Sequence, residues 1–114
     1  MHKTYVYVLE LKDNFYYIGK TEHYEKRIKQ HFSGRGAEWT KRHPPIRIYA
    51  KIEVDESIDA GKIEKLLTKF FALKYGKNKV RGYCWSAYYS RPSTNRIFTE
   101  ENLMLLKKCK INVS

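Results

Sequence analysis

The sequence predicts an α+β fold in which a small three-stranded antiparallel sheet is flanked by helices. Near the N-terminus, two segments rich in Tyr, Val and Leu are separated by a short turn signal. A third segment alternates between apolar and polar residues, as a half-buried strand does. Two further stretches repeat apolar residues at helical spacing. Because 114 residues leave room for one hydrophobic core, we expect a single domain over residues 1–114.

The first element expected is a β-hairpin. Residues 4–11 are rich in Tyr, Val and Leu, and Phe15-Tyr16-Tyr17-Ile18 forms the returning strand. Lys12-Asp13-Asn14 is a turn signal between the two strands, and Gly19 ends the second strand.

A first helix is expected to begin at position 21 or 22 and to end near Phe32, before Ser33-Gly34. Its apolar residues recur every four positions and should face the core: Tyr24, Ile28 and Phe32. A polar stripe with the same spacing lies beside them: His23, Arg27 and His31. The helix should therefore present polar side chains next to its buried face.

The middle of the chain predicts a basic loop followed by a third strand. Residues 34–45 contain several Lys, Arg and Gly residues, and Pro44-Pro45 favours extended backbone. The strand is indicated by the alternation of Ile46, Ile48, Ala50 and Ile52 with polar residues and a tyrosine.

A second, longer helix is expected from positions 55–57 to about Tyr75, with Gly76 as its C-terminal stop. Its apolar stripe consists of Ile63, Leu66, Leu67, Phe70 and Phe71. Residues 77–98 predict a long loop, which in a compact domain is either functional or contains an unrecognised element. Thr99 is a suitable N-cap for a short final helix that ends near Cys109.

The charge of the chain points to a polyanionic partner. Lys and Arg number 23 against 12 acidic residues, which gives a formal net charge of +11. Such an excess favours nucleic acid through counterion release and long-range attraction. The alternatives are a highly soluble surface or a membrane-surface binder. The latter should concentrate its charge on one amphipathic helix, whereas here basic residues spread along the chain between ten tyrosines.

The remaining bulk features favour an intracellular protein. No apolar stretch approaches the roughly 20 residues of a membrane span, so we expect no membrane partner. The start of the chain lacks the pattern of a secretory signal, so the expected location is the cytoplasm, or the nucleus in a eukaryotic or viral setting. Cys84 and Cys109 match no zinc-binding spacing and are expected to be reduced thiols.

The sequence also contains candidates for phosphodiester chemistry. Hydrolysis needs charge neutralisation at the phosphate, an activated water and stabilisation of the leaving oxygen. A basic chain with few carboxylates suits one hard cation that keeps several waters. Glu64 is the best ligand candidate, because it lies about 100° round the helix from Ile63, at the edge of the apolar stripe. The alternative is a surface glutamate paired with Lys65 or Lys69.

Four further residues are candidates of the same kind. Arg27 could clamp a phosphate oxygen, and His31, on the same helical face, could move a proton. Tyr7 and Tyr17 fall on adjacent hairpin strands, where tyrosine also occurs merely because it packs well. Taken alone, Arg27 and His31 are better explained as a solvated polar stripe, and the two tyrosines are weak evidence for a site.

Together these residues resemble the signature of the GIY-YIG nuclease superfamily. Tyr5-Val6-Tyr7 on the first strand is followed, after nine residues, by Tyr17-Ile18-Gly19 on the second. The second half matches the signature fully, whereas Tyr5 stands where the family usually has Gly. The likeness continues with Lys20 after the motif, Arg27 ten residues after Tyr17, and His31 and Glu64 on the two helices. It covers residues 4–85 and leaves 86–114 as a C-terminal extension.

The resemblance implies an endonuclease and assigns a role to each residue. Tyr7 and Tyr17 would line the site, with Tyr7 preferred as the general base or its positioner. Lys20 or His31 would assist removal of that proton. Arg27 would stabilise the five-coordinate phosphate, and Glu64 would bind one Mg²⁺ or Mn²⁺ ion. Hydrolysis would leave 5′-phosphate and 3′-hydroxyl ends.

Nucleic-acid contacts are expected from the loops around this site. The candidates are Arg35, Trp39, Lys41, Arg42, Asn78 and Arg81. Trp39 could stack on a base or anchor its loop in the core. Asn78 lies one position earlier than the Asn that precedes Val-Arg-Gly in some viral and phage relatives.

Two other functions compete with the nuclease. One is a nucleic-acid-binding module that has kept the fold and lost catalysis, and the other is an interaction protein that docks an acidic partner. DNA is the expected substrate, with RNA left open, and the protein could act in a larger complex or as a homodimer.

Overall fold

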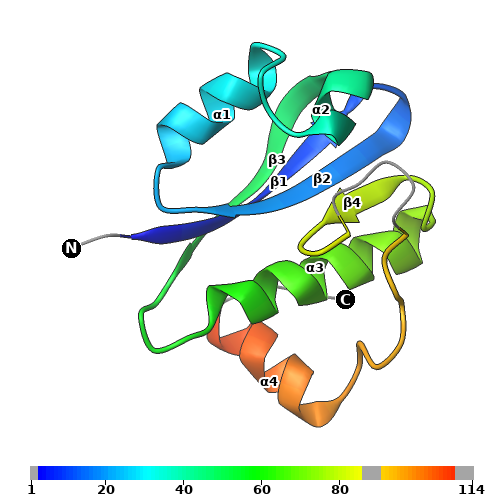
Figure 1. The fold of residues 1–114 in the computed structure, drawn as a ribbon. Helices are drawn as coiled ribbons and strands as arrows, with labels where there is room; N and C mark the ends of the chain where they lie inside the picture. The colour runs from blue at the N-terminus through cyan, green and yellow to red at the C-terminus, as the bar shows by residue number, and fades with distance from the viewer. Residues whose placement is uncertain (1–2, 86–90, 110–114) are drawn as a thin grey trace.

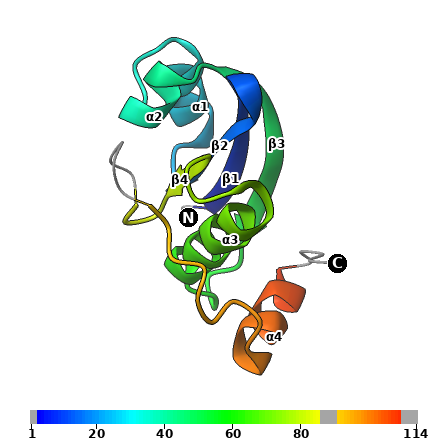
Figure 2. The same cartoon turned by 90° about the vertical axis from the view of Figure 1, so that its right-hand side faces the viewer.

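A computed structural model describes residues 3–85 and 91–109 of the chain. Within these residues a four-stranded mixed sheet has the strand order β3-β1-β2-β4 (Figure 1). The helices α1 and α2 cover one face of the sheet, and α3 covers the other. Figure 2 shows α4 on the outer side of α3, away from the sheet. The α+β class predicted from the sequence is confirmed.

The N-terminal hairpin is formed by β1 (Thr4–Leu11) and β2 (Phe15–Thr21), as predicted. The strands pair in antiparallel register, with Tyr7 opposite Gly19 and Leu9 opposite Tyr17. A single 3-10 turn, η1 (Lys12–Asn14), connects them. Tyr7 and Tyr17 consequently lie diagonally across the strand pair on one face of the sheet.

The third strand, β3 (Pro45–Val54), is an edge strand that pairs antiparallel with β1. Its alternation predicts burial of every second residue, but Ile46 and Ile48 are exposed. Register shifts interrupt the β1–β3 pairing at Val8/Leu9 and at Glu10/Leu11. Because each shift changes which side chains face the core, the predicted alternation applies only to the later part of the strand.

The prediction of a purely antiparallel, three-stranded sheet is wrong. A fourth strand, β4 (Val80–Gly82), runs parallel to β2, with Arg81 opposite Tyr17. It lies in the segment 77–98 that predicts a loop, of which residues 86–90 are outside the described part of the chain. Three residues are too few to show the alternation by which a strand is recognised.

The helices are α1 (Tyr24–Phe32), α2 (Glu38–Arg42), α3 (Ala60–Tyr75) and α4 (Glu100–Lys108). The Asp59 carboxylate accepts from the backbone N–H of Gly61 and caps α3, and Gly76 ends that helix at φ 105°. The Thr99 hydroxyl accepts from Asn102 N–H and caps α4, as expected. The short helix α2 lies within residues 34–45, which the sequence predicts as a basic loop, so that prediction is wrong for residues 38–42.

Two hydrophobic clusters occupy the two faces of the sheet. The first lies under α3 and contains Val6, Val8, Ile18, Ile63 and Leu67. The second lies under α1 and α2 and contains Tyr7, Leu9, Leu11, Tyr17 and Trp39. The prediction of which α1 side chains face the core is only partly right, since Phe32 is exposed and the neighbouring His31 is fully buried.

In the described residues, no helix is long and apolar enough to cross a membrane.

Candidate active site

The centre of the candidate site is the pair Tyr7 and Tyr17, whose ring centroids are 6.5 Å apart. Both side chains are buried in the second cluster, and both come from the β1–β2 hairpin. The phenol of Tyr7 lies over the backbone of Gly19, where a Cβ atom would overlap its Cζ and Oη atoms. The glycine in Tyr17-Ile18-Gly19 therefore leaves the space that the Tyr7 hydroxyl occupies.

Helix α1 places two polar side chains against the tyrosines. The Tyr7 hydroxyl is 2.7 Å from His31 Nε2. The guanidinium of Arg27 lies near enough to both phenols to lower their pKa values. It is also held within its own helix, since Nη1 donates to Gln30 Oε1 at 3.0 Å. The four-residue spacing of Arg27 and His31 thus brings both to the phenols, as the sequence predicts.

Two residues around His31 were not among the sequence candidates. Thr40, on α2, has its Oγ1 atom 3.1 Å from His31 Nδ1. Gly36 packs so closely against the imidazole that a Cβ atom at position 36 would overlap Nδ1. Both lie in the segment predicted as a loop, so nothing in the sequence pattern pairs them with α1.

Burial keeps the phenols and the imidazole of this cluster neutral. Desolvation raises the pKa of Tyr7 and of Tyr17, and the charge of Arg27 opposes this in both cases. Burial, with a smaller effect of Arg27, lowers the pKa of His31 to about 4. Near neutral pH the cluster therefore contains uncharged phenols, an uncharged imidazole and a positive guanidinium.

Glu64 on α3 approaches the same cluster, and its side chain is half-buried. Its negative charge acts on the phenols of Tyr7 and Tyr17. Desolvation raises the pKa of the carboxyl, while Lys20 and the backbone N–H of Tyr83 favour its charged form. The structure therefore brings together the six residues singled out as catalytic: Tyr7, Tyr17, Lys20, Arg27, His31 and Glu64.

The donor set fits a hard cation held by one carboxylate. Among the described residues there is no group of three His, Cys, Asp or Glu side chains that could enclose a metal ion. Glu64 is nevertheless half-buried, its charge acts on both tyrosines, and Lys20 favours the charged form of its carboxyl group. Mg²⁺ is commonly bound by one or two carboxylates and retains several waters, so a single Glu ligand suffices.

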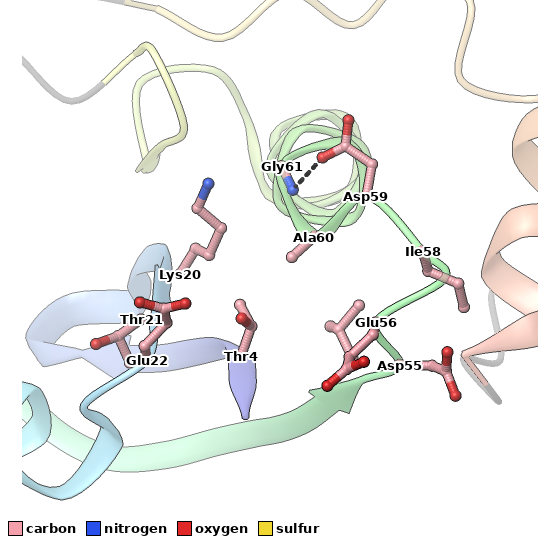
Figure 3. Close-up of a pocket in the computed structure, with 11 residues that line it drawn as sticks. Thr4, Lys20, Thr21, Glu22, Asp55, Glu56, Ile58, Asp59, Ala60 and Gly61 are labelled. Carbon is pink, nitrogen blue, oxygen red and sulfur yellow. Dashed lines mark hydrogen bonds between the residues drawn. The ribbon is translucent and has the colours of Figure 1, made fainter. Parts of the chain in front are cut away.

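A cavity of about 640 Å³ lies on the Lys20 side of the site (Figure 3). Lys20 extends from β2 towards the first turn of α3, where a Cβ on Gly61 would be 3.8 Å from its Nζ. Four carboxylates line the rest of this cavity: Glu22, Asp55, Glu56 and Asp59. Lys20 is the one lysine among the residues that line this cavity.

The six predicted nucleic-acid contacts divide into exposed and buried residues. Arg35, Lys41, Arg42 and Asn78 are exposed, and Arg42 pairs with Glu38 at 3.1 Å. Trp39 is 2% exposed and its indole N–H donates to Tyr16 O at 3.0 Å, so the ring anchors α2 instead of offering a face to a base. Arg81 is 3% exposed, and its Nη1 donates to the carbonyls of Lys77 and Val80. Of the two roles open to Trp39, its burial favours core anchoring over base stacking, and the contacts of Arg81 are mainly structural.

A second cavity, of about 540 Å³, lies between β2, α2 and the start of β4. Its walls carry aromatic and basic side chains: Phe15, Trp39, His43, Asn78, Lys79, Arg81 and Arg91. The rings of Phe15 and His43 stack with centroids 3.7 Å apart, and Lys79 Nζ lies 4.2 Å from the Phe15 ring centroid. Phe15 and Tyr17 alternate on β2 and share one face, so this basic cavity adjoins the tyrosine pair. Sequence reasoning did not identify Phe15, His43 or Lys79.

The sequence is similar to a known domain family and to several known proteins. Residues 3–76 match the GIY-YIG catalytic domain. A UPF0213 protein of Streptococcus pneumoniae (strain ATCC BAA-255 / R6) is 47% identical over 51 residues, which are 44% of this chain and 52% of that protein. The UPF0213 protein YsiG of Lactococcus lactis subsp. lactis is 36% identical over 64 residues, or 56% of this chain and 62% of that protein.

A UPF0213 protein of Syntrophus aciditrophicus is 39% identical over 70 residues, covering 60% of this chain and 80% of that protein. The aligned part of the chain spans 52% of the length of each Streptococcus relative. No solved structure gives a significant match. The family match covers well over half of the 114 residues, including the tyrosine pair and Glu64. The chain belongs to the GIY-YIG catalytic-domain family, a family of nucleases.

Proposed function

We propose that this protein is an endonuclease that hydrolyses phosphodiester bonds in DNA with the help of one divalent cation, leaving 5′-phosphate and 3′-hydroxyl ends. The observation that carries the proposal is the 2.7 Å contact between Tyr7 Oη and His31 Nε2. A phenol and an imidazole at this distance, beside a guanidinium, form a proton acceptor next to a phosphate-binding group.

Tyr7 is the proposed group that removes a proton from the attacking water. Because burial raises the pKa of Tyr7, the residue is a neutral phenol before the reaction. It must therefore lose its own proton as it receives one from the water. The proton from the water passes to Tyr7 Oη while the Tyr7 proton passes to His31 Nε2. The resulting hydroxide attacks phosphorus, and the bond to the 3′ oxygen breaks with its electron pair on that oxygen. A solvent water then gives this oxygen the proton of the 3′-hydroxyl, and His31 returns its extra proton to solvent.

Arg27 and Glu64 complete the proposed chemistry. Arg27, near the two phenols and hydrogen-bonded to Gln30, stabilises the negative charge that develops on the phosphate. Glu64 would hold one Mg²⁺ or Mn²⁺ ion, which when bound supplies positive charge to a phosphate oxygen and to the departing 3′ oxygen. Lys20 favours the charged form of Glu64 and thereby supports its role as a ligand.

The charge distribution supports nucleic acid as the substrate. The net charge of +11 attracts a phosphate backbone, and Arg35 and Lys41 are exposed on the α1–α2 side of the site. The basic cavity beside Tyr17 extends the positive surface along β2. We propose DNA as the nucleic acid, with action in a larger assembly or as a homodimer, in the cytoplasm or in the nucleus of a eukaryotic or viral host.

The test is cleavage of supercoiled plasmid and of a branched DNA oligonucleotide with Mg²⁺, Mn²⁺ or EDTA. Wild type is compared with Glu64→Gln, which removes the charge and keeps the shape, and with Glu25→Gln, which changes an exposed carboxylate on α1. Metal-dependent nicking that Glu64→Gln abolishes and Glu25→Gln retains supports the proposal. Salt-sensitive binding without cleavage under any metal would point to a binding module that has lost catalysis.

A further inference from the structure

The hydroxyl of Thr40 lies beside the ring nitrogen of His31 that faces away from Tyr7. Thr40 is 1% exposed, and its Oγ1 donates to the carbonyl oxygen of Ala37 at 2.8 Å. A hydroxyl has a single proton to donate. Towards His31 Nδ1, 3.1 Å away, the same oxygen can therefore only accept. His31 must then carry its proton on Nδ1.

This assignment fixes the direction of the hydrogen bond at the other ring nitrogen. A neutral imidazole with its proton on Nδ1 has a lone pair on Nε2. Nε2 lies 2.7 Å from Tyr7 Oη, so the phenol donates to it. The result is a directed chain of three hydrogen bonds, from Tyr7 to His31, from His31 to Thr40, and from Thr40 to the backbone of Ala37.

The last acceptor in this series of hydrogen bonds, the Ala37 carbonyl, is fixed by the fold. The Ala37 carbonyl also accepts from the backbone N–H of Lys41 at 3.1 Å, so it belongs to the first turn of α2. Trp39 fixes the same helix to the sheet through its hydrogen bond to Tyr16 O. Gly36 packs against the ring of His31 and limits its rotation. The acceptor for Nδ1–H is the Thr40 hydroxyl, and these contacts of α2 hold that hydroxyl in place.

We propose that Thr40 is a positioning residue that holds His31 in the Nδ1–H tautomer, so that the lone pair of Nε2 faces the Tyr7 hydroxyl; this inference rests on the proposed nuclease function. On transfer, the O–H bond of Tyr7 breaks and an N–H bond forms at Nε2. The ring becomes an imidazolium whose Nδ1–H still donates to Thr40. In the opposite tautomer a proton on Nε2 would face the phenol, and the transfer would have no acceptor.

The experiment uses the full chain with ¹⁵N-labelled histidine and compares Thr40→Val with Thr40→Ser. Long-range ¹H–¹⁵N spectra at neutral pH distinguish the two imidazole tautomers, and His31→Gln assigns the His31 signals. Wild type and Thr40→Ser should show the Nδ1–H form, and Thr40→Val should show a substantial Nε2–H population. Thr68→Val, which removes another buried hydroxyl (a donor to Glu64 O), should leave the His31 pattern unchanged. An Nε2–H form in wild type, or an unchanged tautomer in Thr40→Val, would overturn the proposal.

A cleavage assay then tests the consequence for catalysis. Thr40→Val should lower kcat by on the order of 10²-fold with little change in KM, since only proton transfer is affected. Thr40→Ser should restore most of the rate. If wild type cleaves no substrate, the proposed function fails, while the spectra still decide whether Thr40 sets the tautomer. If wild type cleaves and Thr40→Val cleaves equally well, the positioning role is wrong although the nuclease is real.

Discussion

The Tyr7 hydroxyl lies directly over the backbone of Gly19, in space that any side chain at position 19 would fill. The two residues face each other across the β1–β2 pair, so the fit depends on strand register alone. Gly19 is therefore required by what packs above it and not by an unusual backbone conformation.

Gly19→Ala should destabilise the fold and remove cleavage. The added methyl group forces the Tyr7 ring away from His31, at a cost of about 1–3 kcal/mol for overpacking a buried site. Urea unfolding and plasmid nicking measure the two effects. Gly34→Ala is the control, because no atom lies near its added Cβ and only its φ of 79° opposes the change. Cleavage retained by Gly19→Ala would contradict the position assigned to Tyr7.

Tyr7→Phe should reduce cleavage by about 10²–10⁴-fold, the usual contribution of a positioned general acid or base. The ring and its packing remain, so DNA binding should be unchanged. Tyr5→Phe is the matched control on the same strand, since the Tyr5 hydroxyl only contacts Glu53 Oε1 at 3.4 Å near the surface. Single-turnover cleavage and filter binding separate the two properties. Equal rates for the two variants would exclude Tyr7 as the proton acceptor.

The stability of the protein should fall on acidification because of His31. Its pKa is lowered to about 4 in the folded state, against an ordinary value of about 6.5 when unfolded. Between these values the unfolded chain binds the additional proton, so the free energy of unfolding rises with pH from about 4 to 6.5 and is lost as pH falls through that window.

Urea titrations across this range measure the effect. His31→Gln should reduce the slope by about one proton, and His23→Gln makes the same exchange at an exposed position as the control. Burial also lowers the pKa of His43. Both variants keep His43, so its contribution to the slope is the same in the two. An unchanged slope in His31→Gln would mean that the imidazole is not buried in its neutral form.

Lys79 should contribute to nucleic-acid binding through the basic cavity beside Tyr17. Lys79→Gln removes one positive charge from a wall that also carries Arg81 and Arg91. If Lys79 contacts a phosphate, the slope of log affinity against log salt concentration should decrease in magnitude by about 1. Lys108→Gln, at the exposed end of α4, makes the same change of net charge away from the cavity. Identical slopes for the two variants would show that the cavity does not bind the strand.

Elements whose pattern is local were predicted well from the sequence. The hairpin is specified by Lys12-Asp13-Asn14 between two β-forming segments, and α3 by an apolar stripe of five residues that ends at Gly76. The strand β4 and the helix α2 were missed because three and five residues carry too little periodicity to be recognised. Their conformation depends on contacts with β2 and with the core, which no short sequence window contains.

The residues of the candidate site divide in the same way, into those that local spacing predicts and those that depend on contacts between distant segments. The spacing of Arg27 and His31 on one helix, and of Tyr7 and Tyr17 on adjacent strands, could be deduced before the fold was known. Thr40 and Gly36 could not, because their contact with His31 requires α2 to fold back on α1. For Trp39 the sequence left base stacking and core anchoring open, because the burial that favours anchoring depends on the same folding back.

The shortness of β4 has a consequence for where the two halves of the site can meet. Within the described residues, its pairing with β2 ends at Ile18 and Gly82, one residue before Gly19. The tyrosines and α1 lie on one face of the sheet, and the helix that carries Glu64 lies on the other. In the part of the chain that the structure describes, β2 continues past the end of β4 to Thr21 without a strand on that side, and the charge of Glu64 acts on both tyrosines across the sheet. A longer β4 would cover this edge of β2, so the early end of the strand leaves open the edge at which the two halves of the candidate site approach each other.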